Sequence, residues 1–218
     1  MDAFLGQAIG KIYDCAIDPS QWEDALNFVR DHLDFAFVSV QFVHFPDDYP
    51  ASAPETQMFR TEWDQEWLEA LQPLIADIPK FDQMLAADID QPMSQLRLTD
   101  EAEFQQSAFY EKWVEPQGLR DTLNTSVIKR GNMTAFLSAP TFQSRTMLSD
   151  ADHRTVQLLT PHIRRALLIS DLLDEQKAQL QILRATLDRL VTAVLLVEEA
   201  GQIACCTKIQ QNDGANCL

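Results

Sequence analysis

Residue types that could carry out catalysis occur in this chain, but they are scattered rather than grouped in a recognisable motif. The four histidines fall on separate predicted elements: His32, His44, His153 and His162. Asp14 and Asp18 are one helical turn apart, but Asp18 precedes Pro19 and is better explained as a helix N-cap. The sequence has no GxSxG, HExxH, Walker A or GxGxxG motif. We therefore expect no catalytic residues and no enzyme.

The cysteines do not have the spacing of a metal site. Cys15 lies in a helical apolar pattern, whereas Cys205, Cys206 and Cys217 lie near the C-terminus with no CxxC spacing and no histidine close by. Reduced thiols in a cytosolic protein are the simpler interpretation. We expect no metal and no cofactor.

The charge is strongly negative and unevenly distributed. The net charge is −16, and residues 1–149 carry 10 Lys and Arg against 24 Asp and Glu. Such a body repels phosphate backbones, so direct binding to nucleic acid is disfavoured. The sequence also lacks a signal peptide and any apolar run long enough to cross a membrane, which indicates the cytoplasm.

The elements that must position any site begin with two helices and a strand. Apolar residues at helical spacing predict a helix over residues 4–16, and Asp18-Pro19 predicts a second one that ends at Leu33. The second helix has an apolar face that would cover a sheet: Trp22, Leu26, Val29 and Leu33. Residues 35–45 are apolar on both alternating faces, which predicts a strand covered on both sides. Residues 46–54 predict an exposed loop.

Further elements follow in the middle of the chain. Thr61 is predicted to cap a helix that continues to residue 75, and residues 93–98 predict a strand. Thr99-Asp100 predicts another helix, which continues to residue 114. Residues 122–129 and 133–139, joined by Arg130-Gly131-Asn132, predict a β-hairpin. This order of elements predicts an α+β fold with an antiparallel sheet and helices packed on it.

A long helix is predicted after the hairpin. Ser149 and Asp152 resemble a capping box, and Pro161 predicts a bend where Thr160 would act as a local cap. From His162 onward, alternating steps of four and three give the seam of a two-stranded coiled coil, with Gln176 as its second polar position. Its apolar positions predict a homodimer: Ala166, Ile169, Leu173, Leu180, Leu183, Leu187 and Leu190. The alternative is a helix that packs only on its own domain.

Four stretches together resemble the N-terminal half of bacterial LuxR-type helix-turn-helix transcription regulators. They are IYDCAIDPSQW at residues 12–22, FYEKW at 109–113 with Pro116 and Gly118-Leu119, LLTPHIRRAL at 158–167, and residues 187–203. The resemblance implies a GAF- or PAS-like sensory domain with an antiparallel sheet flanked by helices, followed by a long dimerisation helix. It also implies that DNA is bound through a C-terminal domain absent from this chain.

The same resemblance implies a division of the chain. We expect a GAF/PAS-like sensory domain over residues 1–149, a connector helix over 150–190, and an incomplete PAS-like start with an atypical tail over 191–218. Residues 191–203 look like a first PAS hairpin, with a polar turn at 199–201. After Ala204 the family pattern fails, which leaves a truncation, a frameshift or an artificial boundary open.

A small-ligand pocket between sheet and helices is implied by the GAF-like resemblance. The candidate walls are aromatic and the candidate polar contacts lie near the hairpin: Phe37, Trp67, Tyr110 and Trp113 for the walls, and Asp121, Thr125 and Ser126 for the contacts. Aromatic residues at helical spacing are also typical of an ordinary core.

Three functional hypotheses follow. The first is the sensory and dimerisation part of a transcription regulator, in which a ligand changes the connector helix. The second is a truncated regulator that pairs with a full-length relative and blocks it. The third is a small hydrolase or transferase built on a sensor scaffold.

Overall fold

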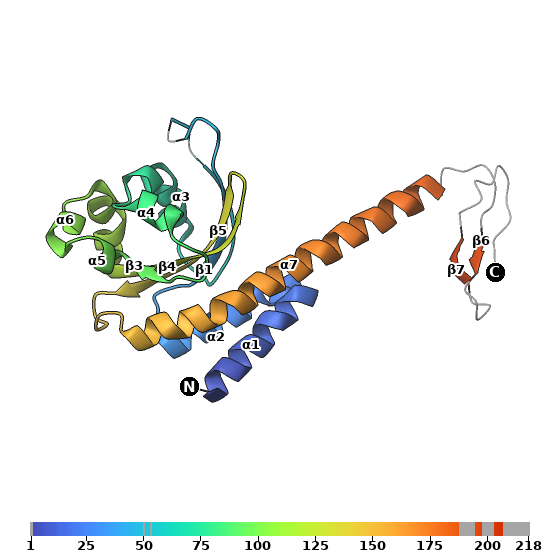
Figure 1. Cartoon of the computed structure of the whole chain (residues 1–218), viewed down its shortest axis with the longest axis horizontal. Helices are drawn as coiled ribbons and strands as arrows, with labels where there is room; N and C mark the ends of the chain where they lie inside the picture. The colour runs from blue at the N-terminus through green and yellow to red at the C-terminus, as the bar shows by residue number, and fades with distance from the viewer. Residues whose placement is uncertain (1, 50, 53, 188–194, 198–202, 207–218) are drawn as a thin grey trace. The chain divides into compact units, whose positions relative to one another are not determined.

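The computed structural model describes residues 2–49, 51–52, 54–187, 195–197 and 203–206. They fall into two compact units, residues 1–170 and 171–218. The first unit is an antiparallel five-stranded sheet with helices on both faces (Figure 1). The predicted α+β architecture is therefore confirmed.

The sheet has the order β2-β1-β5-β4-β3. Its strands are β1 Ser39–His44, β2 Glu55–Arg60, β3 Met93–Ser94, β4 Leu119–Arg130 and β5 Met133–Phe142. The predicted hairpin is confirmed in β4 and β5 and is longer than expected. Gly131 takes a positive φ of 56° in its turn, and the Asn132 side-chain amide donates to the Phe45 carbonyl at 3.0 Å. The turn is thereby tied to the end of β1.

Strand β2 was not predicted from the sequence. It pairs with β1 along one side only, so it forms an edge of the sheet. None of its residues is fully buried, and it lacks the apolar alternation that marks a half-buried strand. The predicted strand at residues 35–45 is confirmed in its second half, because the regular pairing of β1 begins at Ser39.

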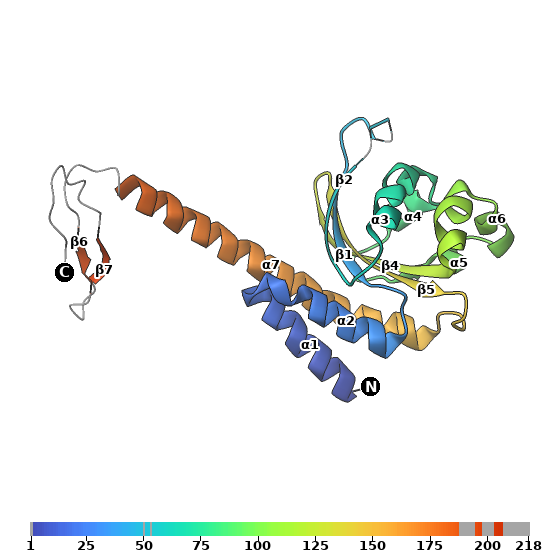
Figure 2. The ribbon, with the colours of Figure 1, turned by 180° about the vertical axis from the view of Figure 1, so that it is seen from behind.

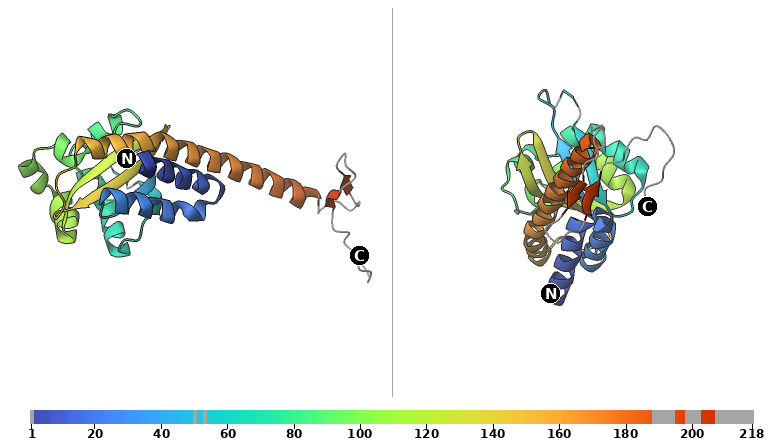
Figure 3. Two further views of the ribbon diagram at one scale, coloured as in Figure 1. Left: turned by 90° about the horizontal axis from the view of Figure 1, so that it is seen from below. Right: turned by 90° about the vertical axis from the view of Figure 1, so that its right-hand side faces the viewer.

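Three helices cover one face of the sheet (Figures 2 and 3). They are α1 Asp2–Ile17, α2 Trp22–Leu33 and the first half of α7 Asp150–Leu187. The Asp18 side chain caps the short 3-10 helix η1 Pro19–Gln21 ahead of α2, as predicted. The predicted apolar face of α2 is buried against the sheet together with residues of α1 and α7. This face holds the main core of the domain.

Helix α7 begins at the predicted capping box. The Ser149 N–H and hydroxyl donate to the Asp152 carboxylate at 2.8 and 2.7 Å, and the Asp152 N–H donates back to the Ser149 oxygen at 3.2 Å. Burial raises the pKa of Asp152, but the Ser149 hydrogen bonds and the Arg145 guanidinium outweigh this and hold that pKa below its ordinary value.

The local helix cap expected at Thr160 is wrong. Pro161 lies inside α7, and the Thr160 hydroxyl donates to the Val156 carbonyl at 2.7 Å instead of capping a new helix. Gln157, whose carbonyl loses its donor at Pro161, is exposed, so water can satisfy this group. The flanking turns are held because Leu159 and Ile163 are buried in the core.

Short helical segments cover the other face of the sheet. They are α3 Gln65–Leu71, η2 Gln72–Asp77, α4 Phe81–Ala86, α5 Gln95–Leu98, α6 Glu101–Gln105, the π-helical turn η3 Tyr110–Val114 and η4 Glu115–Gln117. Helix α4 was not predicted. The predicted strand at residues 93–98 is wrong beyond Ser94, where α5 begins, and the predicted helix at residues 99–114 is broken at Gln106-Ser107.

Thr61 does not cap a helix, contrary to the prediction. Its side chain is buried, and its hydroxyl accepts the Val38 N–H at 3.1 Å. The cap is Asp64, whose carboxylate accepts from the Glu66 N–H at 3.0 Å. Both residues are good N-cap types, so the tertiary contact with Val38 decided between them.

The second unit consists of α7 from Asp171 onward and a pair of strands. β6 Leu195–Val197 pairs antiparallel with β7 Ile203–Cys206. A hairpin was predicted over residues 191–203, and its turn at 199–201 lies outside the described residues. The first unit extends to Ser170, beyond the predicted boundary at 149, because the first half of α7 belongs to its core.

Candidate functional site

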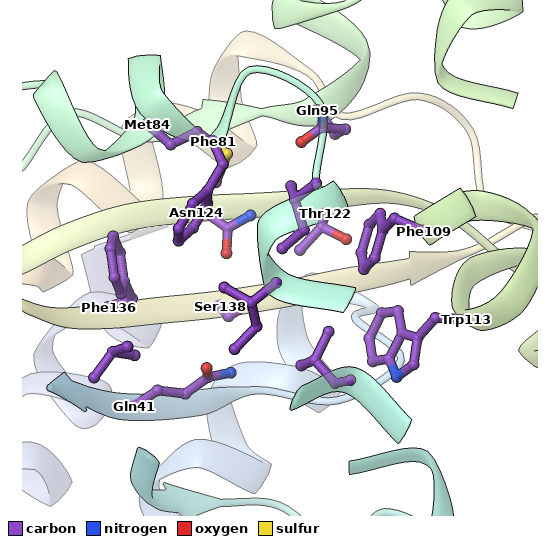
Figure 4. Close-up of a pocket in the computed structure, with 14 residues that line it drawn as sticks. Gln41, Phe81, Met84, Gln95, Phe109, Trp113, Thr122, Asn124, Phe136 and Ser138 are labelled. Carbon is purple, nitrogen blue, oxygen red and sulfur yellow. The ribbon is translucent and has the colours of Figure 1, made fainter. Parts of the chain in front are cut away.

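A cavity lies between the sheet and the cover of short helical segments (Figure 4). Its free volume is about 70 Å³. Strands β1, β4 and β5 supply its floor: Gln41, Val43, Thr122, Asn124, Phe136 and Ser138. The helical cover supplies its roof: Leu71, Ile75, Ile78, Phe81, Met84, Gln95, Phe109 and Trp113.

The floor of the cavity is polar where three strands meet. Asn124 and Ser138 are register partners on β4 and β5, and Gln41 lies on β1 beside Phe136. The Gln41 amide donates to the Ser39 hydroxyl at 2.9 Å, which orients it along the strand. These amide and hydroxyl groups offer both donors and acceptors to a bound molecule.

The roof is apolar apart from Gln95, and hydrogen bonds hold two of its side chains in place. The Trp113 indole N–H donates to the Trp67 carbonyl at 2.7 Å, and its ring stacks on Phe109 at a centroid distance of 5.4 Å. Gln95 is also held, since its amide donates to the Pro79 carbonyl at 2.7 Å and the Thr99 hydroxyl at 3.2 Å. No ionisable side chain is among the residues that line the cavity.

A smaller cavity of about 10 Å³ adjoins the first and shares Met84, Asn124 and Phe136 with it. Thr125 and Ser126 also line it, and both hydroxyls are buried without a hydrogen-bond partner. An unpaired buried hydroxyl costs about 1–3 kcal/mol. Successive strand residues point to opposite faces of the sheet, so Ser126, like Asn124, faces the cavity, whereas Thr125 and its register partner Leu137 face the main core. A ligand or water in the smaller cavity that reached the Ser126 hydroxyl would recover that cost.

The structure places the predicted pocket residues in different surroundings. Trp113 lines the larger cavity, and Thr125 and Ser126 line the smaller one. The other three aromatic residues pack in an apolar cluster with Phe104 and Trp113 and line neither cavity: Phe37, Trp67 and Tyr110. Of the predicted residues, the larger cavity thus includes Trp113 alone.

The Asp121 carboxylate accepts hydrogen bonds from backbone N–H groups. The donors are the Leu96 N–H at 3.1 Å and the Thr122 N–H at 2.8 Å, and Asp121 lines neither cavity. Burial raises its pKa above the ordinary value in spite of these hydrogen bonds. Asp121 thus joins the first turn of α5 to β4.

Sequence reasoning missed most of the cavity floor. Gln41 is a polar residue inside an otherwise apolar strand, and that contrast was an available signal. Asn124 and Ser138 become neighbours only through the β4–β5 register, which the sequence did not specify. The roof residues Phe81 and Met84 lie on α4, a helix that was not predicted.

The residues of the predicted dimer seam differ in their exposure along α7. Ala166 is fully buried in the core of its own chain and is not available to a partner, so that part of the seam is corrected. Ile169, Leu180 and Leu183 are exposed by 41%, 56% and 51%, and Leu173 is half-buried. The Leu187 side chain and Leu190 lie outside the described residues.

The described residues offer neither a metal site nor a reactive thiol. Within the described part of the chain, no three His, Cys, Asp or Glu side chains come together as a metal site would require. Burial raises the pKa of the Cys15 thiol to about 11, which keeps it protonated and unreactive at neutral pH. None of the described helices has the length and apolarity needed to cross a bilayer.

The sheet with helices on both faces is similar in fold to GAF domains and to the ligand-binding domains of LuxR-type regulators. The ligand-binding domain of VqsR from Pseudomonas aeruginosa matches 76% of this chain and 94% of its own, with a TM-score of 0.56 and 12% identity. The N-acylhomoserine-lactone-dependent LuxR-family factor CepR2 from Burkholderia cenocepacia matches 75% of this chain and 98% of its own, with a TM-score of 0.52 and 12% identity.

A GAF domain outside that group also matches. The phycoerythrobilin-bound GAF domain of a cyanobacterial phytochrome matches 78% of this chain and 96% of its own, with a TM-score of 0.50 and 12% identity. The chain spans 61% of the longer Escherichia coli SdiA chain. No family model matches the sequence, and no curated protein is similar enough in sequence to be called a relative.

Proposed function

We propose that this chain is the sensory part of a LuxR-type transcription regulator and that it binds a small molecule in the cavity between sheet and helices. The observation that carries the proposal is a cavity with a polar floor and an apolar roof, in a fold shared with regulator ligand-binding domains. The proposed division is a sensory domain, a connector helix and a C-terminal start of a further domain. DNA would be bound by a domain outside this chain, in the cytoplasm.

The lining favours an uncharged ligand. Because no ionisable side chain faces the cavity, a charged ligand would lose its hydration without gaining a counter-charge. An uncharged molecule with an apolar body fits the roof, and a head group with donors and acceptors fits Asn124, Ser138 and Gln41. Ser126 would contribute a further hydroxyl at the smaller cavity.

The size of the cavity requires that binding opens it. Ligand sites usually have about 300–1,000 Å³, far more than the cavity provides. The roof consists of short segments, whereas the other face of the sheet is covered by the longer α1, α2 and α7. We expect the roof to move outward on binding, since the short helices hold fewer buried side chains than the main core.

N-octanoyl-homoserine lactone is a suitable first probe, because CepR2 depends on N-acylhomoserine lactones and this molecule is neutral with an apolar chain. Calorimetric titration of the full chain is expected to give saturable binding. Asn124→Ala and Ser138→Ala should each weaken it about fivefold to tenfold, since one hydrogen bond contributes about 1 kcal/mol. Ser144→Ala, an exposed residue beyond β5, is the matched control.

The titration has a clear negative result. If neither this lactone nor any of a panel of neutral amphiphiles binds, and if native mass spectrometry of the purified chain shows no bound small molecule, the sensory proposal is refuted. Binding that is unaffected by Asn124→Ala and Ser138→Ala would refute the assigned site.

We further propose that α7 pairs with a second copy of the chain through its exposed apolar residues after Ser170. Leu180 and Leu183 follow the seven-residue seam and are more than half exposed. Sedimentation should show a dimer that Leu180→Asp with Leu183→Asp dissociates. Ala178→Asp with Ala185→Asp adds the same charge on the opposite side of the helix and should leave the dimer intact. A monomeric parent chain would refute this pairing.

The alternatives draw no supporting observation from the structure. Nothing in the described residues favours an antagonist of a full-length relative over a sensor. The structures compared above are regulator and photoreceptor sensory domains rather than enzymes, and we propose that this chain has no catalytic activity.

A further inference from the structure

The segment between α4 and β3, residues 87–92, forms one wall of the smaller cavity. Ala87 and Gln91 line that cavity, and Met84, just before the segment, lines both cavities. A molecule that filled the two cavities would press on this wall, because the free volume inside them is small. The bonds that hold the wall therefore determine what its movement does to the rest of the domain.

Two sets of hydrogen bonds attach the wall and the adjoining end of α4 to β4, one from Lys129 and one from Asp90. The Lys129 ammonium donates to the Leu85 carbonyl at 2.5 Å and also to the Ala87 carbonyl. The Asp90 N–H donates to the Ser126 carbonyl at 3.0 Å. Since β3 pairs only with Leu123 and Asn124, the rest of β4 has an open edge there, and the wall lies along it.

A third set of hydrogen bonds leads from the wall to α7, which lies against the other face of the sheet (Figure 2). The Arg164 guanidinium donates through one nitrogen to both carboxylate oxygens of Asp90, each at 2.7 Å. Both side chains are only about one-quarter exposed, at 24% and 23%. Such a charge-assisted pair is stronger than an exposed one.

Both ends of this pair are firmly placed. Arg164 follows Ile163 and precedes Ala166 and Leu167, all buried in the main core. Asp90 has a φ of 65°, a left-handed conformation that Asn and Asp tolerate better than most residues. Asp90 is in addition held through its N–H, which donates to the Ser126 carbonyl at 3.0 Å.

We propose that the Asp90–Arg164 pair is a latch that couples the cavity wall to the seating of α7 on the sheet. A ligand that pushes residues 87–91 outward separates Asp90 from Arg164 and loosens α7 around residues 156–167. Coupling of this kind is reciprocal, so a change in α7 also alters the cavity. The role of the cavity rests on the proposed function, whereas the coupling itself belongs to the ligand-free protein.

Hydrogen exchange of the ligand-free full chain tests the latch. Asp90→Asn keeps the size and the left-handed tolerance of the residue but removes its charge. We expect amide exchange to become about tenfold faster both in residues 85–91 and in residues 156–167. Arg164→Gln should give the same pattern, the double variant should add little, and Arg164→Lys should restore part of the protection.

The matched control is Asp150→Asn. It removes another ion pair of α7, between Arg97 and Asp150 at 2.8 Å, in which Asp150 is almost fully exposed. This control should change exchange only in the first turn of α7. The amides of α2 are the internal reference, because general destabilisation would speed their exchange as well.

The outcomes separate the latch from the ligand hypothesis. If Asp90→Asn affects only residues 85–91 and leaves residues 156–167 protected, the latch is refuted whatever the ligand. If N-octanoyl-homoserine lactone binds, it should reproduce the faster exchange in residues 156–167, and binding without that change would also refute the latch. If the lactone and the neutral panel do not bind but the variants behave as expected, the coupling stands and the sensory proposal fails.

Discussion

Phe136→Ala is the substitution that most directly probes the cavity. Phe136 lines both cavities, is buried, and lies 6.4 Å from the Phe81 ring across the larger one. Removing the ring would merge the two spaces into one. Replacing a buried Phe by Ala costs about 3–5 kcal/mol. We expect the lower end, about 3 kcal/mol, because Met84 is flexible and can fill part of the space.

Urea unfolding followed by circular dichroism gives this free energy. The control is Phe142→Ala on the same strand, where the ring is 39% exposed and pairs with Trp63 at the surface. It should cost about 1 kcal/mol, since less apolar surface is lost from the folded state.

A second measurement uses benzene as an apolar probe of the enlarged space. Benzene at ten times its dissociation constant should stabilise Phe136→Ala by about 1.4 kcal/mol. It should have little effect on Phe142→Ala or the parent chain, whose cavity is smaller than the ring requires. If the two substitutions cost the same, or if benzene stabilises all three proteins equally, the packing described around the cavity is wrong.

Three further predictions concern single side chains. Trp113→Phe removes the indole N–H that donates to the Trp67 carbonyl, and it should lower the free energy of unfolding in urea by about 1–3 kcal/mol. Trp63 is half-buried, so Trp63→Phe should lower it by less. Equal losses for the two variants would contradict this assignment. Because the folded-state pKa of Asp152 is lowered, its contribution is present above the unfolded value of about 3.9 and is lost as pH falls through the folded value. Asp152→Asn should therefore destabilise the chain at pH 7, and the difference should shrink as the pH falls below the unfolded-state value. A difference that stays constant would argue against the carboxylate. The folded-state pKa of Asp121 is raised, so the parent chain should lose stability relative to Asp121→Asn as the pH rises from about 4 to 7. Melting temperatures that show the opposite trend would refute an upward shift of this pKa.

The main core was predictable because its signals are local. Asp18 with Pro19, the apolar face of α2, the Ser149–Asp152 box and the turn at Gly131 all act within a few residues of the chain. Each agrees with the tertiary structure, so the local pattern and the final packing point the same way.

The helical cover was predicted less well because its segments are too short to carry strong local signals. Its segments are short, and α4, α5 and α6 have six residues or fewer, so no long periodic pattern marks them. Thr61 and Asp64 are both suitable caps, and only the contact of Thr61 with Val38 excludes the first. The edge strand β2 was missed because pairing with β1, rather than burial, makes it a strand.

The sequence by itself determined the fold class, the acidic body, the hairpin and the long C-terminal helix, since charge and apolar periodicity depend on residue order alone. Tertiary structure decided the site. Gln41, Asn124 and Ser138 come from three strands and meet through strand register, and Asp90 meets Arg164 across 74 positions of the chain. It also decided that Ala166 belongs to the core, because one face of α7 is buried against the sheet before the exposed seam begins. Such contacts depend on how distant elements pack, which no local pattern encodes.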